Sequence, residues 1–146
     1  MLLIVDANII LSAVVTNGKA KQIFEKNKIF GMLDLYAPEY LSEQIEENAL
    51  EIMKKSRLTF EEFRLSLMFV ASQIKFVESE MFAEFLAEAE KISPPRDFQY
   101  VALSMYFKSR DTDASIWSND KELAKVSGIK ALTTHELDRL LISRGL

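Results

Sequence analysis

Short apolar runs alternate along the chain with longer segments of helical periodicity, and this alternation limits the fold more than any other feature. The first run, Leu2–Val5, is wholly apolar, which is typical of a strand buried on both faces of a parallel sheet. Similar short runs lie at residues 33–37, 74–77, 114–117 and 129–132. Because helical segments separate the runs, the sequence predicts a three-layer α/β/α fold with a mainly parallel sheet of four or five strands.

Polar residues mark where the helices between these strands begin. Asn8 is expected to cap the first helix through its side-chain oxygen, and Pro38 suits the first turn of the helix after the second strand. Thr59 followed by Glu62 has the form of a capping box. The helices before and after this box are expected to turn their apolar stripes inward, and these stripes are Leu41, Ile45, Ala49 and Ile52, then Phe60, Phe63, Leu67 and Val70.

Length and composition bound the class of protein. A chain of 146 residues fits one ordinary domain, and 49% hydrophobic with 27% charged residues is the composition of a globular chain. Residues 1–146 are therefore expected to form a single domain. The absence of cysteine excludes disulfides, thiolate nucleophiles and cysteine-ligated zinc, and a single histidine excludes multi-histidine metal sites.

The apolar runs and the net charge limit the partners of the chain. The runs fall short of the roughly 20 residues that a membrane span needs, and no basic region precedes the first one as in a signal peptide. We therefore expect a soluble, cytoplasmic protein without a membrane partner. A net charge of −4 does not suit a protein that holds nucleic acid by its overall charge. A nucleic-acid role requires a local basic patch or bound cations.

Three aspartates stand where predicted strands end or predicted helices begin. Asp6 follows the first strand, Asp120 follows the strand at residues 114–117, and Asp97 precedes an apolar helix. Each one alone could cap a helix or form a turn. Ligands of parallel α/β sheets bind outside the carboxyl ends of the strands, so the three carboxylates are expected at one edge. Clustered carboxylates repel one another, and hard cations such as Mg²⁺ or Mn²⁺ keep them ionised.

The segments around these aspartates resemble motifs of the PIN-domain family. Residues 3–10, with Asp6-Ala7-Asn8 after an apolar strand, are similar to the family's opening motif. Residues 97–104 are similar to its third motif, an aspartate that opens a helix. Residues 116–121 resemble the fourth, a strand followed by Thr/Ser-x-Asp. The motifs occur in family order, so the resemblance spans essentially the whole chain.

The resemblance implies a ribonuclease that hydrolyses RNA phosphodiester bonds with Mg²⁺ or Mn²⁺. In that role Asp6, Asp97 and Asp120 are catalytic acids that hold the metal, and Asn8 and Ser118 orient them through hydrogen bonds. Two alternatives stay open, with Asn8 as a plain helix cap and Ser118 as a partner of local backbone groups. Many small PIN proteins are toxins held by an antitoxin, and many are dimers. The resemblance therefore also implies an antitoxin partner and a homodimer.

One position departs from the family pattern. PIN domains usually carry a glutamate, followed by an aliphatic residue, on the helix after the second strand, and here Gln44 stands directly before Ile45. Successive helical residues are about 100° apart, which places Gln44 at the border of the buried stripe and Glu43 nearer to solvent. We expect Glu43 to act as the substitute acid. An amide at Gln44 weakens the charge that holds the metal, so activity is expected to be reduced or to need more metal.

Two other functions compete with the nuclease. Gln44 and the acidic net charge favour a catalytically weakened PIN-like module that binds RNA or a protein partner. Another alternative is an α/β enzyme that is phosphorylated on Asp6, since such enzymes also carry an aspartate after the first strand. Those enzymes commonly need a second aspartate two residues later, where this chain has Asn8. A metal titration followed by an RNA cleavage assay separates the nuclease from the binding module.

Overall fold

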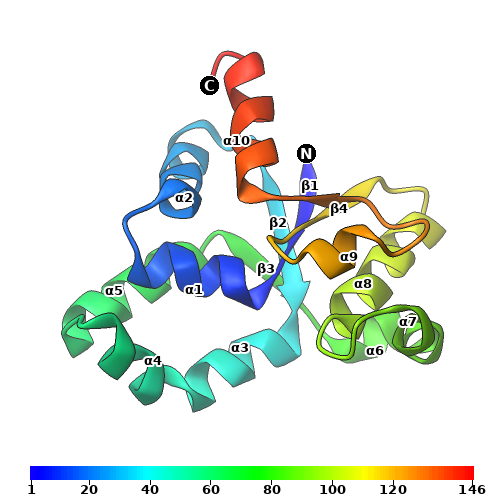
Figure 1. The fold of residues 1–146 in the computed structure, drawn as a ribbon, viewed down its shortest axis with the longest axis horizontal. Helices are drawn as coiled ribbons and strands as arrows, with labels where there is room; N and C mark the ends of the chain where they lie inside the picture. The colour runs from blue at the N-terminus through cyan, green and yellow to red at the C-terminus, as the bar shows by residue number, and fades with distance from the viewer.

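Five short strands form one sheet in the order β3-β2-β1-β4-β5, and every neighbouring pair is parallel (Figure 1). The computed structural model describes residues 1–146 without a gap. The strands are β1 (Leu2–Val5), β2 (Asp34–Pro38), β3 (Ile74–Val77), β4 (Ala114–Trp117) and β5 (Ala131–Leu132). In the central strand, Leu3 pairs with Leu35 of β2 on one side and with Ser115 of β4 on the other. The prediction of a parallel sheet with up to five strands is confirmed.

Helices cover both faces of this sheet. Figure 1 shows α1, α2, α5 and α10 on one side of the strands and α6, α7 and α8 on the other, with α3 and α4 leading from β2 to α5. The helices are α1 (Ala7–Val15), α2 (Lys19–Phe30), α3 (Glu39–Glu47), α4 (Ala49–Ser56), α5 (Phe60–Ala71), α6 (Ser79–Phe82), the short 3₁₀ turn η1 (Ala83–Phe85), α7 (Leu86–Ile92), α8 (Phe98–Ser109), α9 (Lys121–Ala124) and α10 (Thr134–Ser143). The three-layer prediction is therefore confirmed as well.

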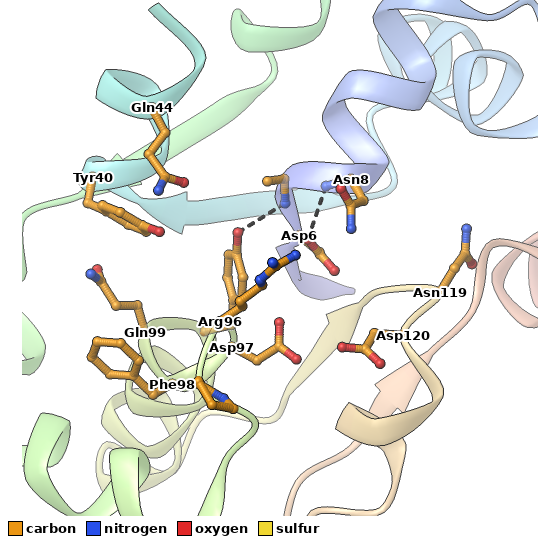
Figure 2. Close-up of a pocket in the computed structure, with 13 residues that line it drawn as sticks. Asp6, Asn8, Tyr40, Gln44, Arg96, Asp97, Phe98, Gln99, Asn119 and Asp120 are labelled. Atoms are coloured by element: carbon orange, nitrogen blue, oxygen red, sulfur yellow. Dashed lines mark hydrogen bonds between the residues drawn. The ribbon is translucent and has the colours of Figure 1, made fainter. Parts of the chain in front are cut away.

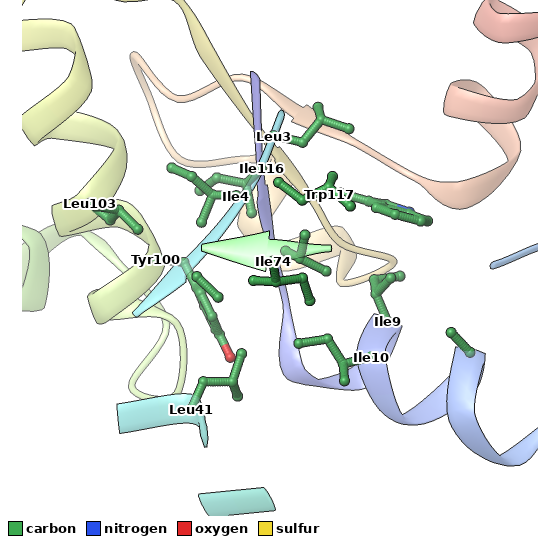
Figure 3. Packing of buried hydrophobic residues seen from close by; sticks show 14 of the residues in the cluster. Leu3, Ile4, Ile9, Ile10, Leu41, Ile74, Tyr100, Leu103, Ile116 and Trp117 are labelled. Carbon is green, nitrogen blue, oxygen red and sulfur yellow. The ribbon is translucent and has the colours of Figure 1, made fainter. Parts of the chain in front are cut away.

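The hydrophobic core surrounds the central strand on both faces. The side chains of Leu3, Ile4 and Val5 are fully buried, because helices pack on each side of β1. Figure 3 shows the α8 side chains on one side of the strands and those of α1 on the other. Trp117 at the end of β4 stacks on Phe24 of α2, with 5.3 Å between the ring centroids. The wholly apolar sequence of β1 thus reflects burial on both faces.

Trp117 is a core residue. Its side chain is fully buried, and its indole Nε1–H donates to Thr134 Oγ1 at 3.0 Å. A buried indole N–H needs such a partner, because an unpaired donor away from water costs about 1–3 kcal/mol. This contact ties the start of α10 to the end of β4, directly before the loop that carries Asp120.

Two expected helix starts are wrong, and one is confirmed. Asp6 is the N-cap of α1, whereas Asn8 lies inside the helix and contributes its backbone N–H to that cap. Pro38 is the last residue of β2 and the N-cap of α3, one residue before the first turn where it was expected, because its backbone is extended with ψ 140°. Thr59 and Glu62 do form the predicted capping box of α5, with both reciprocal hydrogen bonds present.

The helix expected to carry Ala49 and Ile52 on the stripe of Leu41 is broken at Asn48 into α3 and α4. The Asn48 side chain donates to the carbonyl oxygen of Gln44 at 2.7 Å, so it competes with the backbone pattern of a continuous helix. As a result Ala49 and Ile52 are only partly buried. Phe60 was expected to face the core and is instead 64% exposed at the first position of α5.

None of the helices is long and apolar enough to cross a membrane.

Candidate active site

A cleft of about 650 Å³ opens beyond the carboxyl ends of the central strands. The end of β1, the face of α3 that carries Gln44, the turn before α8 and the loop after β4 line it. Asp6, Asp97 and Asp120 all contribute to its wall, and Figure 2 shows their carboxylates turned toward a common space. The parallel sheet therefore brings together three acids that are far apart in the sequence.

Asp6 is a buried carboxylate with two hydrogen-bond donors. Its side chain is 4% exposed, Oδ1 accepts from the backbone N–H of Asn8 at 3.0 Å, and Oδ2 accepts from the hydroxyl of Ser118 at 2.6 Å. The backbone N–H of Asp6 also donates to the carbonyl oxygen of Trp117 at 3.1 Å. These hydrogen bonds replace the water that the carboxylate loses on burial.

Ser118 connects the two acids at the ends of β1 and β4. While its hydroxyl donates to Asp6, its oxygen accepts from the backbone N–H of Asp120 at 3.1 Å. Asp120 Oδ1 in turn accepts from the backbone N–H of Glu122 at 3.0 Å and caps α9. The neighbouring carboxyl of Asp97 holds the pKa of Asp120 below its ordinary value, and the backbone hydrogen bonds at the start of α9 act in the same direction.

Asp97 occupies the N-cap position of α8 but makes no capping hydrogen bond. Its side chain is 5% exposed, and Oδ2 is buried without a hydrogen-bond partner. Burial raises the pKa of Asp97 to about 7, and the neighbouring carboxyls of Asp120 and Asp6 add to the rise. A helix cap would not leave this oxygen unpaired, so local structure alone does not explain Asp97.

Tyr100 also belongs to the cleft, although the sequence did not single it out. It lies one turn after Asp97 on α8, and its buried hydroxyl accepts from the backbone N–H of Ala7 at 3.0 Å. Burial raises the pKa of the Tyr100 phenol, and the carboxylate of Asp6 acts in the same direction. The neutral hydroxyl thereby joins α8, which carries Asp97, to the first residue after Asp6. In the sequence Tyr100 has the periodicity of a core residue, which hides this contact.

The wall formed by α3 places Gln44 in the cleft and does not place Glu43 there. Gln44 and Tyr40 line the cleft from the side facing the acids (Figure 2). Glu43 is exposed and is not part of the cleft wall, because one residue along a helix turns the side chain by about 100°. The structure therefore does not support Glu43 as the substitute acid. The side chain of Asn8 lines the cleft, although the hydrogen bond to Asp6 comes from its backbone.

The sequence matches a known family over nearly its whole length. A sequence model of the family described as PIN domain matches residues 4–142. The chain belongs to the PIN domain family. No curated protein matches the sequence.

The PIN fold is also seen in a solved structure that is similar to this chain. The similar structure is a chain of VapBC2 from Rickettsia felis, in a crystal structure bound to a DNA fragment from their promoter. The TM-score is 0.64 at 12% sequence identity, and the likeness covers 91% of this chain and 98% of that chain. At this identity the likeness concerns the fold alone.

The acids of this PIN domain offer oxygen donors to a cation. The structure contains no group of three or more histidine, aspartate or glutamate side chains arranged to hold a metal ion. Two other observations fit a divalent cation at this place. Asp97 Oδ2 is a buried carboxylate oxygen without a partner, and two neighbouring carboxyls oppose the ionisation of Asp97. A hard cation would relieve both conditions, and an all-oxygen donor set suits Mg²⁺ or Mn²⁺.

Asp97→Asn should stabilise the metal-free protein at high pH and have little effect at low pH. Because the folded chain raises the pKa of Asp97 from 3.8 to about 7, the stability that its proton provides is complete below about pH 4 and is lost as the pH rises through about 7. One pKa unit corresponds to about 1.4 kcal/mol, so the free energy of unfolding at about pH 8 should rise by about 1 kcal/mol or more. Urea unfolding curves of both proteins, recorded with a chelator at about pH 4 and at about pH 8, measure this difference in the free energy of unfolding.

The control for this experiment is Asp34→Asn, which changes an exposed aspartate at the opposite end of the sheet. It should change the free energy of unfolding by less than about 0.5 kcal/mol at either pH. An equal effect of Asp97→Asn at both pH values would show that the raised pKa of Asp97 is not the source of instability.

Proposed function

We propose that this PIN domain is a metal-dependent ribonuclease that hydrolyses RNA phosphodiester bonds with Mg²⁺ or Mn²⁺. The observation that carries the proposal is the meeting of Asp6, Asp97 and Asp120 in one cleft, where Asp97 is buried with an unpaired oxygen. An arrangement that places repelling carboxylates together costs stability unless a cation binds there. Membership of the family supports the same activity.

In this proposal each acid has a separate part. Asp97 and Asp120 face each other and would hold the cation, with Asp6 as the third acid of the site. When bound, the cation supplies Lewis-acid activation of a water molecule and stabilises negative charge on the phosphate. Ser118 keeps Asp6 and the loop of Asp120 in place through the hydroxyl that both share. No side chain has to form a covalent bond with the substrate.

We further propose that the chain acts in the cytoplasm as the toxin of a toxin–antitoxin pair and forms a homodimer. The similarity in fold to a chain of VapBC2 supports an antitoxin protein as the partner. The proposed antitoxin would restrain cleavage of RNA until it is removed.

A second candidate function is a weakened PIN-like module that binds RNA or a protein partner. Gln44 favours it, because the α3 wall of the cleft carries an amide where the family usually has an acid. With Glu43 outside the cleft, no acid of α3 replaces it. The two functions share the cleft and differ in whether cleavage follows binding.

Replacing Asp6 and Asp97 together by asparagine should abolish cleavage. Both amides keep the shape of the side chains but remove two negative charges, and hard cations favour carboxylate over amide oxygens. The rate of RNA cleavage in Mn²⁺ should fall by about 10³-fold or more, equivalent to about 4 kcal/mol in the barrier. The exposed Asp34→Asn variant serves as the control and should cleave at the wild-type rate. Retained cleavage by the double variant would refute the nuclease proposal.

Ser118→Ala should weaken cleavage without abolishing it. The change leaves Asp6 with one donor fewer and frees the backbone N–H of Asp120. Partners of metal-binding groups typically contribute about 10- to 100-fold to affinity or activity, so cleavage and Mn²⁺ affinity should both fall within this range. Ser115→Ala is a matched control on β4, the strand that Ser118 follows, and its cleavage rate should fall by less than about twofold. Equal losses for both variants would argue against a special role of Ser118.

Gln44→Glu should lower the Mn²⁺ concentration needed for half-maximal cleavage. A new carboxylate on the α3 wall would add roughly 1 kcal/mol of attraction to a cation in the cleft, which corresponds to a change of about fivefold. Glu43→Gln removes a charge from the neighbouring exposed position and should leave the metal requirement unchanged. If Glu43→Gln raised the requirement and Gln44→Glu did not lower it, the assignment of Gln44 to the family's acidic position would have to be abandoned.

A further inference from the structure

Arg96 is the one basic residue that lines the cleft. Three aspartates line the same cleft, so an approaching phosphate meets mostly negative charge there. Figure 2 shows the Arg96 side chain over the middle of the cleft, between the acids and the wall that carries Tyr40. A phosphate in the cleft can therefore come within reach of this guanidinium.

The guanidinium of Arg96 is not used by another group of the protein. None of the five ion pairs of the chain includes it, and no hydrogen bond holds its side chain. The charge of Arg96 lowers the pKa of the neighbouring Asp97, but no ion pair joins the two side chains and Asp97 Oδ2 stays unpaired. A structural arginine would normally satisfy some of its five donors within the fold. These donors are free for a ligand.

The backbone of Arg96 is held in a tight turn. The N–H of Asp97 donates to the carbonyl oxygen of Pro94 at 2.9 Å, which closes a turn with Pro95 at its second position and Arg96 at its third. Proline at the second position of such a turn fixes the backbone in advance. The turn therefore sets where the arginine leaves the chain, directly before the acid that opens α8.

We propose that Arg96 binds a phosphate of the nucleic-acid substrate and offsets the repulsion between that phosphate and the three aspartates. This inference rests on the proposed nuclease function and adds a substrate-binding residue to it. The planar guanidinium can donate two parallel hydrogen bonds to phosphate oxygens, a geometry that lysine cannot reproduce. The two kinds of residue then bind different groups: the aspartates bind the cation, and Arg96 binds the phosphate.

The test compares Arg96→Gln and Arg96→Lys with Arg139→Gln, which removes an exposed arginine from α10. Three quantities are measured: kcat/KM for a single-stranded RNA in Mn²⁺, the affinity for that RNA in the Asp97→Asn background, and the affinity of the otherwise unchanged chain for Mn²⁺. Arg96→Gln should lower kcat/KM by about 100-fold and RNA affinity by about 10-fold. Arg96→Lys should recover part of both, and Arg139→Gln should stay within about twofold of wild type.

Arg96→Gln should weaken the binding of RNA without weakening the binding of Mn²⁺. Removing a positive charge from the cleft should leave Mn²⁺ binding unchanged or tighter, whereas RNA binding should weaken and lose about 0.7 from the slope of log affinity against log salt. A DNA strand of the same sequence should show the same loss, because a phosphate contact does not involve the sugar. Joint weakening of Mn²⁺ and RNA binding would mean that Arg96 only supports the turn, and unchanged RNA binding would refute the contact.

The outcome also separates this inference from the proposed function. If the wild-type chain binds RNA through Arg96 but does not cleave it with Mn²⁺ or Mg²⁺, the nuclease proposal fails and the phosphate contact stands. If the chain cleaves RNA and Arg96→Gln has no effect, the phosphate contact fails and the nuclease proposal stands. A wild-type chain that neither binds nor cleaves RNA would overturn both.

Discussion

The hydrogen bond from Ser118 to Asp6 is the contact on which the site depends. The carboxylate of Asp6 at the end of the central strand is almost fully buried, and burying a carboxylate costs free energy unless hydrogen-bond donors replace the lost water. Of the two hydrogen bonds that the Asp6 side chain accepts, the one from the Ser118 hydroxyl is the shorter, at 2.6 Å. The same hydroxyl oxygen accepts from the backbone N–H of Asp120. One hydroxyl thus fixes the geometry at the ends of both β1 and β4. The parallel pairing of these strands places the hydroxyl within reach.

The fold stabilises two of the acids and leaves the third strained. Asp6 and Asp120 cap helices and accept backbone hydrogen bonds, so both have partners within ordinary local structure. Asp97 is as buried as a core residue, but its Oδ2 has no hydrogen-bond partner, and burial raises the pKa of its carboxyl group. Native proteins keep such a group only where the rest of the fold tolerates its cost, and these places are often functional sites. The cost at Asp97 therefore fits the proposal that a cation binds at this point.

The sequence patterns predicted most of the sheet and the meeting of the three aspartates, since both follow from local rules. An apolar strand ending in Asp6 and a strand ending in Ser118 must meet at one edge if the sheet is parallel. The contact of Tyr100 with Ala7 was not predictable, because it depends on the packing of α8 against the start of α1. The break at Asn48 was also missed, since an asparagine within a helical pattern can point to solvent or bond to the backbone, and only the structure shows which.

The distribution of charge across the cleft explains why one substituted residue on α3 matters. The acids all lie at the ends of β1 and β4 and at the start of α8, whereas the α3 wall presents Gln44 and Tyr40, which are neutral. A cation bound in the cleft as proposed would therefore be attracted from one side only. An acid at Gln44 would surround the cation more evenly, but it would also add repulsion toward an incoming phosphate. In the proposed nuclease, the amide would make the cleft bind the cation less strongly and admit the anion more easily, so the metal concentration would be the quantity that limits cleavage.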